Sequence, residues 1–325
     1  MLGSKGRVIV CFMLMQFFII AAMAQQPRII PPYDMSRYDH VIQTIYKSVL
    51  NNPNDDFDKR IIKVNNYFLG KPYVLGALGE GQNGEFDQQP LYRTDEFDCT
   101  TYVETLLALA EAKNFSEFQT TIEKIRYHNK QISFLDRNHF TSVDWNSGNQ
   151  KNGYIKDITG QFQLPYKITD TLIDKPNWYR TLPVSNMQLL SSLNPQQMQA
   201  LLKKFRANAE KVKAERSHTR FIPLTELFSN ANGAIVTDKG FFDSMPTVSI
   251  IEIVRDNYDL TAKIGTHLDI THLGFAIRTR QGLMFYEASE LNDRTLALPL
   301  DKYLLSYYKF AANRDSIGIN IEKII

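Results

Sequence analysis

The sequence predicts an α+β protein in which several helices precede an antiparallel sheet. Apolar residues recur at helical spacing in the first third of the chain, and from Thr247 onward they follow a strand-like pattern. A run of helices followed by a run of antiparallel strands is typical of the α+β class. With 325 residues the chain is long enough for one large domain or two small ones.

Four helices are expected in the first part of the chain, over Tyr38–Leu50, Phe57–Leu69, Thr100–Ala112 and Phe115–Arg126. The third is the clearest, because its apolar residues recur at i, i+3, i+4 and i+7 from Val103. Asp98 is its expected N-cap, and Phe97 with Tyr102 its expected hydrophobic staple. The glycines between Gly76 and Gly84 predict a loop, and no phosphate-binding lysine and serine follow it.

The middle of the chain, from residue 129 to about 243, contains asparagine-rich turns and one expected helix, Pro195–Glu215. We interpret residues 140–245 as an elaborating insertion, because no linker is evident and residues 25–325 then form a single domain. Four strands are expected after it, over Val248–Val254, Thr271–Arg278, Leu283–Ala288 and Ile317–Ile321.

The N-terminus has the order of a secretory signal peptide. Lys5 and Arg7 precede the apolar run Val8–Ala21, and Ala22–Ala24 matches a small-x-small cleavage site. Residues 1–24 are therefore expected to be removed, which predicts a periplasmic or secreted protein. The alternative is an uncleaved anchor, which would then be the protein's membrane contact. No cysteine follows the cleavage site, so the sequence does not indicate a lipoprotein. The formal net charge of +2 and the lack of a long basic run give no indication of nucleic-acid binding.

Cys99 is the first candidate for chemistry. Of the two cysteines, Cys11 lies in the signal segment, so the mature chain keeps only Cys99 and has no partner for an internal disulfide. An intermolecular disulfide, a buried apolar role or a reactive thiol remain open. Next to the expected N-cap Asp98, Cys99 occupies the first helical position, where free N–H groups and the helix dipole favour a thiolate. The same N–H groups suit an oxyanion, so we favour the reactive thiol.

A reactive thiol needs a base, and His272 is the best candidate among His40, His128, His139, His218, His267 and His272. His272 lies in a strand-like run and shares a face with Gly274 and Ala276, small residues that we expect to leave room for a substrate. A structural histidine is the alternative. Glu287, on the next expected strand, is the candidate third group that orients the imidazole; an ordinary salt bridge or a solvated carboxylate is its alternative.

A metal site is the rival interpretation of this region. His267, Asp269 and His272 superficially resemble a ligand cluster. In an extended segment, however, His267 and Asp269 share one face and His272 points to the other. We therefore expect no metal and no other cofactor.

Several blocks together resemble a known family. Gly70-Lys71-Pro72-Tyr73-Val74-Leu75-Gly76, Phe97-Asp98-Cys99-Thr100-Thr101-Tyr102-Val103, His272-Leu273-Gly274-Phe275 and Tyr286-Glu287-Ala288-Ser289 resemble, in order, those of the NlpC/P60 cysteine peptidase superfamily. The narrower resemblance is to its DUF1460 branch, described as N-acetylmuramoyl-L-alanine amidase-like. It rests on Ile125-Arg126-Tyr127, Asn138-His139-Phe140, Asp144-Trp145, Phe221-Ile222-Pro223 and Leu268–His272.

The resemblance implies a papain-like α+β fold, with the nucleophile at a helix N-terminus packed on an antiparallel sheet. It implies that Cys99 is the nucleophile and His272 the base. The third position is commonly histidine in this branch, and Glu287 occupies it here. The implied substrate-binding residues are Tyr73, Asp98, His139, Asp144 and Trp145, with structural roles as an alternative for the last three.

The implied activity is hydrolysis of peptidoglycan muropeptides at the bond between the muramic lactyl group and L-alanine. Three alternatives remain open at this point. The same chemistry on the γ-D-glutamyl bond to the diamino acid would make the protein an endopeptidase. A binding module that keeps the fold would have no activity, and a metal-dependent amidase would lose its activity on chelation.

Overall fold

The computed structural model describes residues 26–129, 131–310 and 313–325. The expected signal peptide lies outside these residues. Within them, no helix is both long and apolar enough to cross a membrane.

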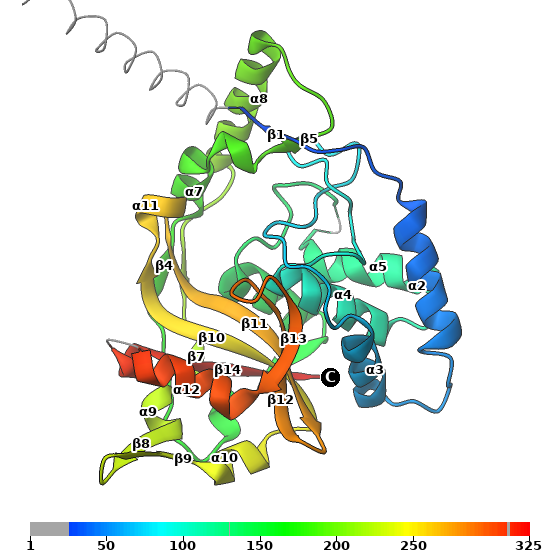
Figure 1. Ribbon diagram of the computed structural model, residues 1–325. Helices are drawn as coiled ribbons and strands as arrows, with labels where there is room; N and C mark the ends of the chain where they lie inside the picture. The colour runs from blue at the N-terminus through cyan, green and yellow to red at the C-terminus, as the bar shows by residue number, and fades with distance from the viewer. Residues whose placement is uncertain (1–25, 130, 311–312) are drawn as a thin grey trace, which may run out of the picture.

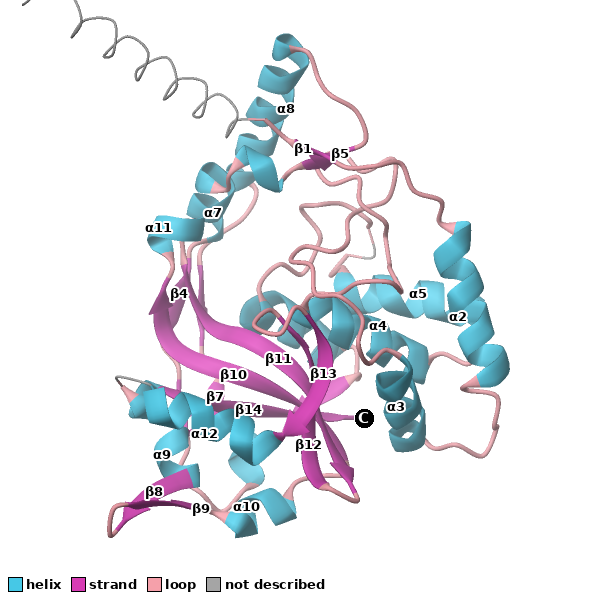
Figure 2. Ribbon diagram, in the orientation of Figure 1, coloured by secondary structure: helices cyan, strands magenta, loops and turns pink. Residues whose placement is uncertain are grey.

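In the described part of the chain, an eight-stranded antiparallel sheet forms the centre of the fold (Figures 1 and 2). Its strand order is β13-β12-β11-β10-β14-β7-β3, and β2 also pairs with β14. The strands are β2 (Ile155–Asp157), β3 (Lys167–Ile168), β7 (Arg220–Pro223), β10 (Val248–Asp259), β11 (His267–Thr279), β12 (Gly282–Ser289), β13 (Arg294–Pro299) and β14 (Ile317–Ile324). The expected α+β class with an antiparallel sheet is confirmed.

Helices cover both faces of this sheet. Four helices pack on one face, through a core that includes Leu107, Leu273 and Phe275. They are α2 (Ser36–Ser48), α3 (Phe57–Tyr67), α4 (Cys99–Glu111) and α5 (Phe115–Arg126). The other face is covered by α9 (Leu224–Leu227), α10 (Lys239–Ser244) and α12 (Leu300–Phe310), through a core that includes Ile251, Ala276 and Phe285. Figure 2 shows α12 and the α2–α5 group on opposite sides of the strands.

A smaller aromatic core lies beyond the end of β10 and β11 (Figure 1). It is built mainly by α7 (Lys175–Thr181) and α8 (Pro195–Ala207), with α11 (Thr261–Ile264) beside it. The remaining elements are α6 (Ser147–Lys151), the π-helix η1 (Thr141–Asn146), and strands β1 (Arg28–Ile29), β4 (Thr171–Ile173), β5 (Gln188–Leu189), β6 (Glu215–Ser217), β8 (Phe228–Ala231) and β9 (Ala234–Thr237), together with short 3-10 helices at η2 (Thr159–Gln161), η3 (Val184–Asn186), η4 (Asn208–Glu210) and η5 (Arg314–Ser316). The segment 140–245 therefore supplies most of this core, together with Phe86 and Phe134, and it also supplies β2, β3 and β7 to the central sheet.

The four expected N-terminal helices and the four expected strands are all present, with ends that differ by a few residues. The helix expected over Pro195–Glu215 is wrong in its second half. It ends at Ala207, and Glu215 instead begins β6, which pairs with β4. The backbone of Glu215 pairs with Ile173 of β4, so tertiary contacts override the local helical spacing. Neither β13 nor α12 was predicted from the sequence.

Candidate functional site

The first turn of α4 is fixed by its N-cap. Asp98 accepts from the Thr101 N–H at 2.8 Å, and the Thr101 hydroxyl accepts from the Asp98 N–H at 2.9 Å, which forms a capping box. The second carboxylate oxygen of Asp98 accepts from the Gly76 N–H at 3.0 Å. The rings of Phe97 and Tyr102 lie 5.7 Å apart, as the staple predicts. Asp98 thus ties the glycine-rich loop to the helix that begins at Cys99.

Cys99 is partly exposed at this helix start. Within the described residues, no acceptor is found for the backbone N–H groups of Cys99 and Thr100. Free N–H groups at a helix N-terminus are oriented outward along the dipole, where they can hold an anion. The sulfur therefore lies beside two donors that an oxyanion can use.

His272 and Glu287 lie just past the point where two paired strands separate. The ladder between β11 and β12 ends at Phe275 opposite Tyr286, so both residues lie beyond its last pair. On its other side, His272 pairs with Ile253, and a register shift follows because Val254 pairs with Ile270. Thr271 is the extra residue of this β-bulge, a feature that re-aims neighbouring side chains.

His272 contacts both of its expected partners. Its Nε2 atom is hydrogen-bonded to Oε2 of Glu287, and Cys99 lies near enough to the ring to raise its pKa. Since Nε2 is occupied by Glu287, Nδ1 is the nitrogen left for the sulfur. The side chain of Glu287 is only 3% exposed and that of His272 only 15%. The structure therefore brings Cys99, His272 and Glu287 together in one chain of contacts.

These contacts determine the charge of the imidazole. Burial of the ring lowers the pKa of His272, but the neighbouring Cys99 and Glu287 side chains raise it to about 10. The ring is consequently an imidazolium at neutral pH.

Small residues beside His272 do not open space for a ligand, so this expectation is wrong. A Cβ on Gly274 would lie 2.5 Å from the carbonyl oxygen of Tyr286 and 2.8 Å from the ring of Phe285. Ala276 is fully buried. Gly274 is needed for the close approach of β12, and Phe285 fills the volume behind the histidine ring.

Tyr73 lies beside the start of α4. It forms a parallel bridge with Phe97, two residues before Cys99. Burial raises the pKa of the Tyr73 hydroxyl, and the nearby charges of Cys99, Asp98 and Glu290 raise it further. The hydroxyl therefore stays protonated at neutral pH and is available as a donor.

Tyr303 and Tyr307 of α12 also lie at the site, although neither was predicted from the sequence. The Tyr303 ring lies 6.3 Å from the ring of His272 and 4.7 Å from that of Phe285. Its hydroxyl lies 3.2 Å from the hydroxyl of Tyr307. Burial raises the pKa of both tyrosines, and the charges of Cys99 and Glu287 contribute. The only sequence signal was the i, i+4 spacing of two aromatic residues on a helix.

Trp145, Asp144 and His139 lie elsewhere. Trp145 is completely buried under α4, where its indole N–H donates to Glu104 at 3.1 Å. Asp144 is paired with Lys175, and His139 contacts the carbonyl oxygen of Phe134 at 2.6 Å. Burial lowers the pKa of His139 to about 3, so its ring is neutral.

His139 and Asp144 line a cavity of about 670 Å³ whose walls include Lys175 and Glu215. Cys99 and His272 are not among the residues that line it. The structure therefore does not bring these residues into contact with the cysteine and histidine pair.

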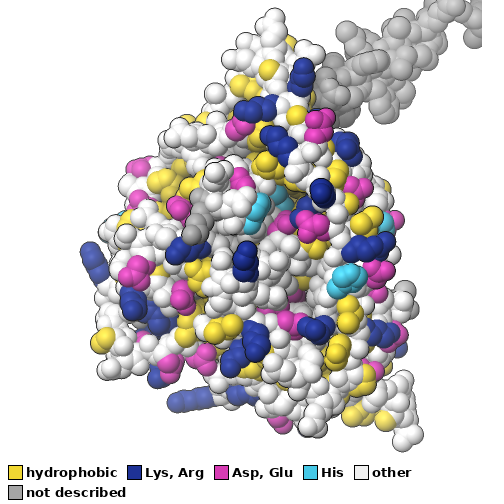
Figure 3. Space-filling model, turned by 180° about the vertical axis from the view of Figure 1, so that it is seen from behind, with side chains coloured by type: hydrophobic (Ala, Val, Ile, Leu, Met, Phe, Trp, Pro, Cys, Tyr) yellow, Lys and Arg dark blue, Asp and Glu magenta, His cyan; other side chains and the backbone are white. Residues whose placement is uncertain are grey.

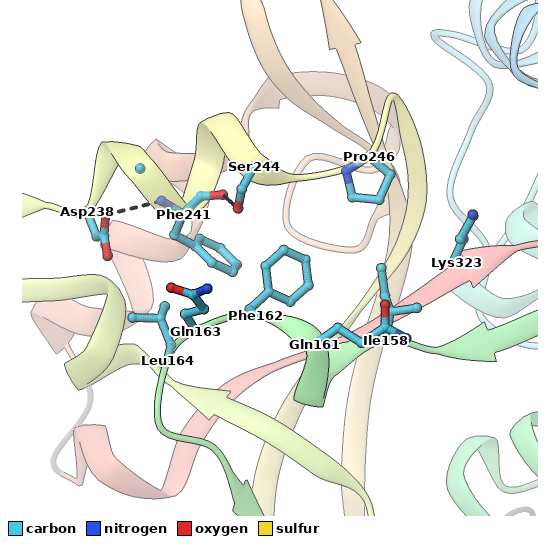
Figure 4. Close-up of a pocket in the computed structure, with 11 residues that line it drawn as sticks. Ile158, Gln161, Phe162, Gln163, Leu164, Asp238, Phe241, Ser244, Pro246 and Lys323 are labelled. Atoms are coloured by element: carbon cyan, nitrogen blue, oxygen red, sulfur yellow. Dashed lines mark hydrogen bonds between the residues drawn. The ribbon is translucent and has the colours of Figure 1, made fainter.

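Another cavity of about 670 Å³ lies between α10 and the turn after β2 (Figure 4). The rings of Phe162 and Phe241, 5.1 Å apart, form its apolar wall. No expected site residue lines it. The face of the molecule in Figure 3 carries basic and acidic side chains side by side, with no single-sign patch.

The residues of the rival metal interpretation do not converge. One carboxylate oxygen of Asp269 accepts hydrogen bonds from the hydroxyls of Thr169, Ser217 and Thr219. His267 lies 3.7 Å from Asp259 at the surface. Among residues 26–129, 131–310 and 313–325, no three His, Cys, Asp or Glu side chains are grouped as metal ligands.

Comparisons with known proteins agree with this fold. A family model described as AmiA-like, N-acetylmuramoyl-L-alanine amidase-like, matches residues 63–309. A solved structure from Legionella pneumophila, described with the family model DUF1460, is 35% identical, covers 89% of this chain and 95% of its own, and gives a TM-score of 0.81. A solved N-acetylmuramoyl-L-alanine amidase from Bacteroides uniformis is 22% identical, covers 83% of this chain and 99% of its own, and gives a TM-score of 0.53. No curated protein matches the chain.

Proposed function

Because the chain belongs to the AmiA-like (DUF1460) family of N-acetylmuramoyl-L-alanine amidase-like proteins, we propose that it is a cysteine amidase of peptidoglycan fragments. In this proposal Cys99 is the nucleophile, His272 the acid and base, and Glu287 the group that orients the imidazole. The observation that carries it is the position of the His272 ring, hydrogen-bonded to Glu287 and close enough to Cys99 for the two groups to influence each other. A helix-start cysteine facing a strand histidine also supports the papain-like NlpC/P60 assignment.

The first half of the reaction forms a thioester. The Cys99 thiolate attacks the carbonyl carbon of the amide, and the carbonyl oxygen becomes an oxyanion. The N–H groups of Cys99 and Thr100 and the hydroxyl of Tyr73 are arranged to donate to that oxygen. The His272 imidazolium then gives its proton to the leaving nitrogen as the C–N bond breaks, so the amine departs neutral.

The second half hydrolyses the thioester. His272, now neutral, takes a proton from water while the water oxygen attacks the thioester carbon. The C–S bond breaks, the acid product leaves, and the thiolate and imidazolium pair is restored. Glu287 accepts a hydrogen bond from Nε2 of His272, which leaves Nδ1 to face the sulfur.

The proposed scissile bond joins the muramic lactyl group to L-alanine, the bond for which the N-acetylmuramoyl-L-alanine amidase of Bacteroides uniformis is named. The test is digestion of a defined disaccharide–tetrapeptide, followed by mass spectrometry of the products. Release of intact tetrapeptide supports the proposal, whereas release of muramoyl-L-alanyl-D-glutamate assigns the γ-D-glutamyl bond instead. Cys99→Ala is expected to abolish release, and full activity in that variant contradicts the mechanism. Chelation is expected to leave the rate unchanged.

Export is part of the same proposal, since peptidoglycan lies outside the cytoplasmic membrane. We propose that residues 1–24 are cleaved after Ala24. N-terminal sequencing of the mature protein is expected to begin at Gln25.

A further inference from the structure

Two leucines are unusually exposed for large apolar side chains. Leu291 is 93% exposed and Leu75 is 72% exposed, the two largest values for large hydrophobic residues in the described part of the chain. A single exposed leucine is ordinary. These two come from distant parts of the sequence, and their loops are bonded to each other beside the start of α4.

The Leu75 loop runs alongside the start of α4. The N–H of Val74 donates to the carbonyl oxygen of Phe97 at 2.9 Å, and the N–H of Gly76 donates to the carboxylate of Asp98 at 3.0 Å. Hydrogen bonds on both sides of Leu75 therefore hold its backbone beside the residues that precede Cys99.

The Leu291 loop joins β12, which carries Glu287, to β13. The Asn292 amide donates to the hydroxyl of Ser289 at 3.0 Å, which tightens the turn around Leu291. The two loops are also bonded to each other, because the N–H of Tyr73 donates to the carbonyl oxygen of Asp293 at 3.0 Å. They meet at Tyr73, whose pKa is raised by burial and by the nearby Cys99 and Glu290.

Both leucines are thus exposed to solvent on anchored loops that meet beside the start of α4. We propose that Leu75 and Leu291 form an apolar lip that binds the small aliphatic groups flanking the scissile amide, such as the lactyl and alanyl methyl groups. This inference rests on the proposed amidase function and names part of the specificity of the same site. Burial of leucine surface against these methyl groups contributes to binding without touching the reacting atoms.

The test uses the variants Leu75→Ser, Leu291→Ser and the double variant in the full-length mature protein. Ile168→Ser is the matched control, since Ile168 is 53% exposed on β3, at the opposite edge of the sheet from β13. Each single variant is expected to raise KM about three- to tenfold while kcat changes by less than about twofold, because uniform binding is lost. The double variant is expected to raise KM further. Leu75→Met, which keeps a large apolar side chain, and the Ile168→Ser control are both expected to keep the wild-type KM.

Two further readouts separate this inference from the proposed function. If the wild-type protein cleaves the disaccharide–tetrapeptide and the leucine variants have an unchanged KM, the binding role of the lip is wrong but the proposed function stands. Wild-type protein that does not cleave it overturns the proposed function, and the lip is then decided by calorimetry. In the Cys99→Ala background, a three- to tenfold weaker binding of the same compound in the leucine variants supports the lip (about 0.7–1.4 kcal/mol), and equal or absent binding overturns it.

Discussion

Replacing Glu287 with glutamine isolates the charge of this residue from its shape. Glutamine keeps an oxygen that accepts from Nε2 of His272, but it removes the negative charge beside the ring. Both side chains are largely buried, so solvent screens this charge only weakly.

The magnitude follows from Coulomb's law. Two unit charges about 4 Å apart interact by about 4 kcal/mol at an effective dielectric constant of about 20, an upper bound for this substitution. Cys99 and the remaining hydrogen bond continue to favour the charged ring, so the variant is expected to lower the pKa of His272 from about 10 to between about 8 and 9.

Losing the charge of Glu287 is expected to reduce both the activity at high pH and the stability of the fold. A histidine pKa raised above 6.5 stabilises the fold fully below that value, and this contribution is lost as the pH rises toward 10. Glu287→Gln is therefore expected to lower the free energy of unfolding at pH 7 by about 1.4–2.7 kcal/mol and to move the alkaline limb of the activity profile to lower pH.

The assay is the pH dependence of kcat/KM and of Cys99 alkylation by iodoacetamide, with urea unfolding alongside. Glu210→Gln, which removes an exposed carboxylate after α8, is the matched control. If both pH profiles of folded Glu287→Gln superimpose on those of the wild type, Glu287 does not control the charge of His272 and the reasoning fails.

Three further substitutions test the architecture around the site. Asp98→Ala removes the cap of α4 and is expected to cost about 1–2 kcal/mol in urea unfolding; an unchanged midpoint contradicts the capping role. Gly274→Ala forces a Cβ against the backbone oxygen of Tyr286 and is expected to cost about 1–3 kcal/mol, whereas a neutral result means that β12 moves freely. Burial raises the pKa of Glu252 to about 8 with the help of nearby negative charges, so its ionisation destabilises the fold as the pH rises from 4.5 to 8. Glu252→Gln is therefore expected to raise the free energy of unfolding at pH 8 by at least about 1 kcal/mol and to change it little at pH 4.5, as measured by urea unfolding. An equal increase at both pH values refutes a charge effect.

Sequence alone predicted the α+β class and the start of α4, because both depend on local rules. Apolar spacing defines an amphipathic helix, and Asp98 followed by Thr101 satisfies the first-turn N–H groups wherever the helix lies in the fold. The ordered blocks around Tyr73, Cys99 and His272 also predicted the family, which the family model confirms. The alternation is confirmed for Ala276, which lies in a different core from Leu273 and Phe275, and His272 lies against Phe285 and Tyr303.

The tertiary structure decided which candidate side chains meet. His139, Asp144 and Trp145 carry suitable chemistry, but contacts with Phe134, Lys175 and Glu104 hold them away from Cys99. Tyr303 reaches the imidazole only because α12 folds back across the sheet, a long-range contact that no local pattern encodes. The role of Gly274 likewise depends on the approach of β12, since a missing Cβ has meaning only when the neighbouring strand is in place. Local rules specify elements and caps, whereas the meeting of distant groups depends on how the elements pack.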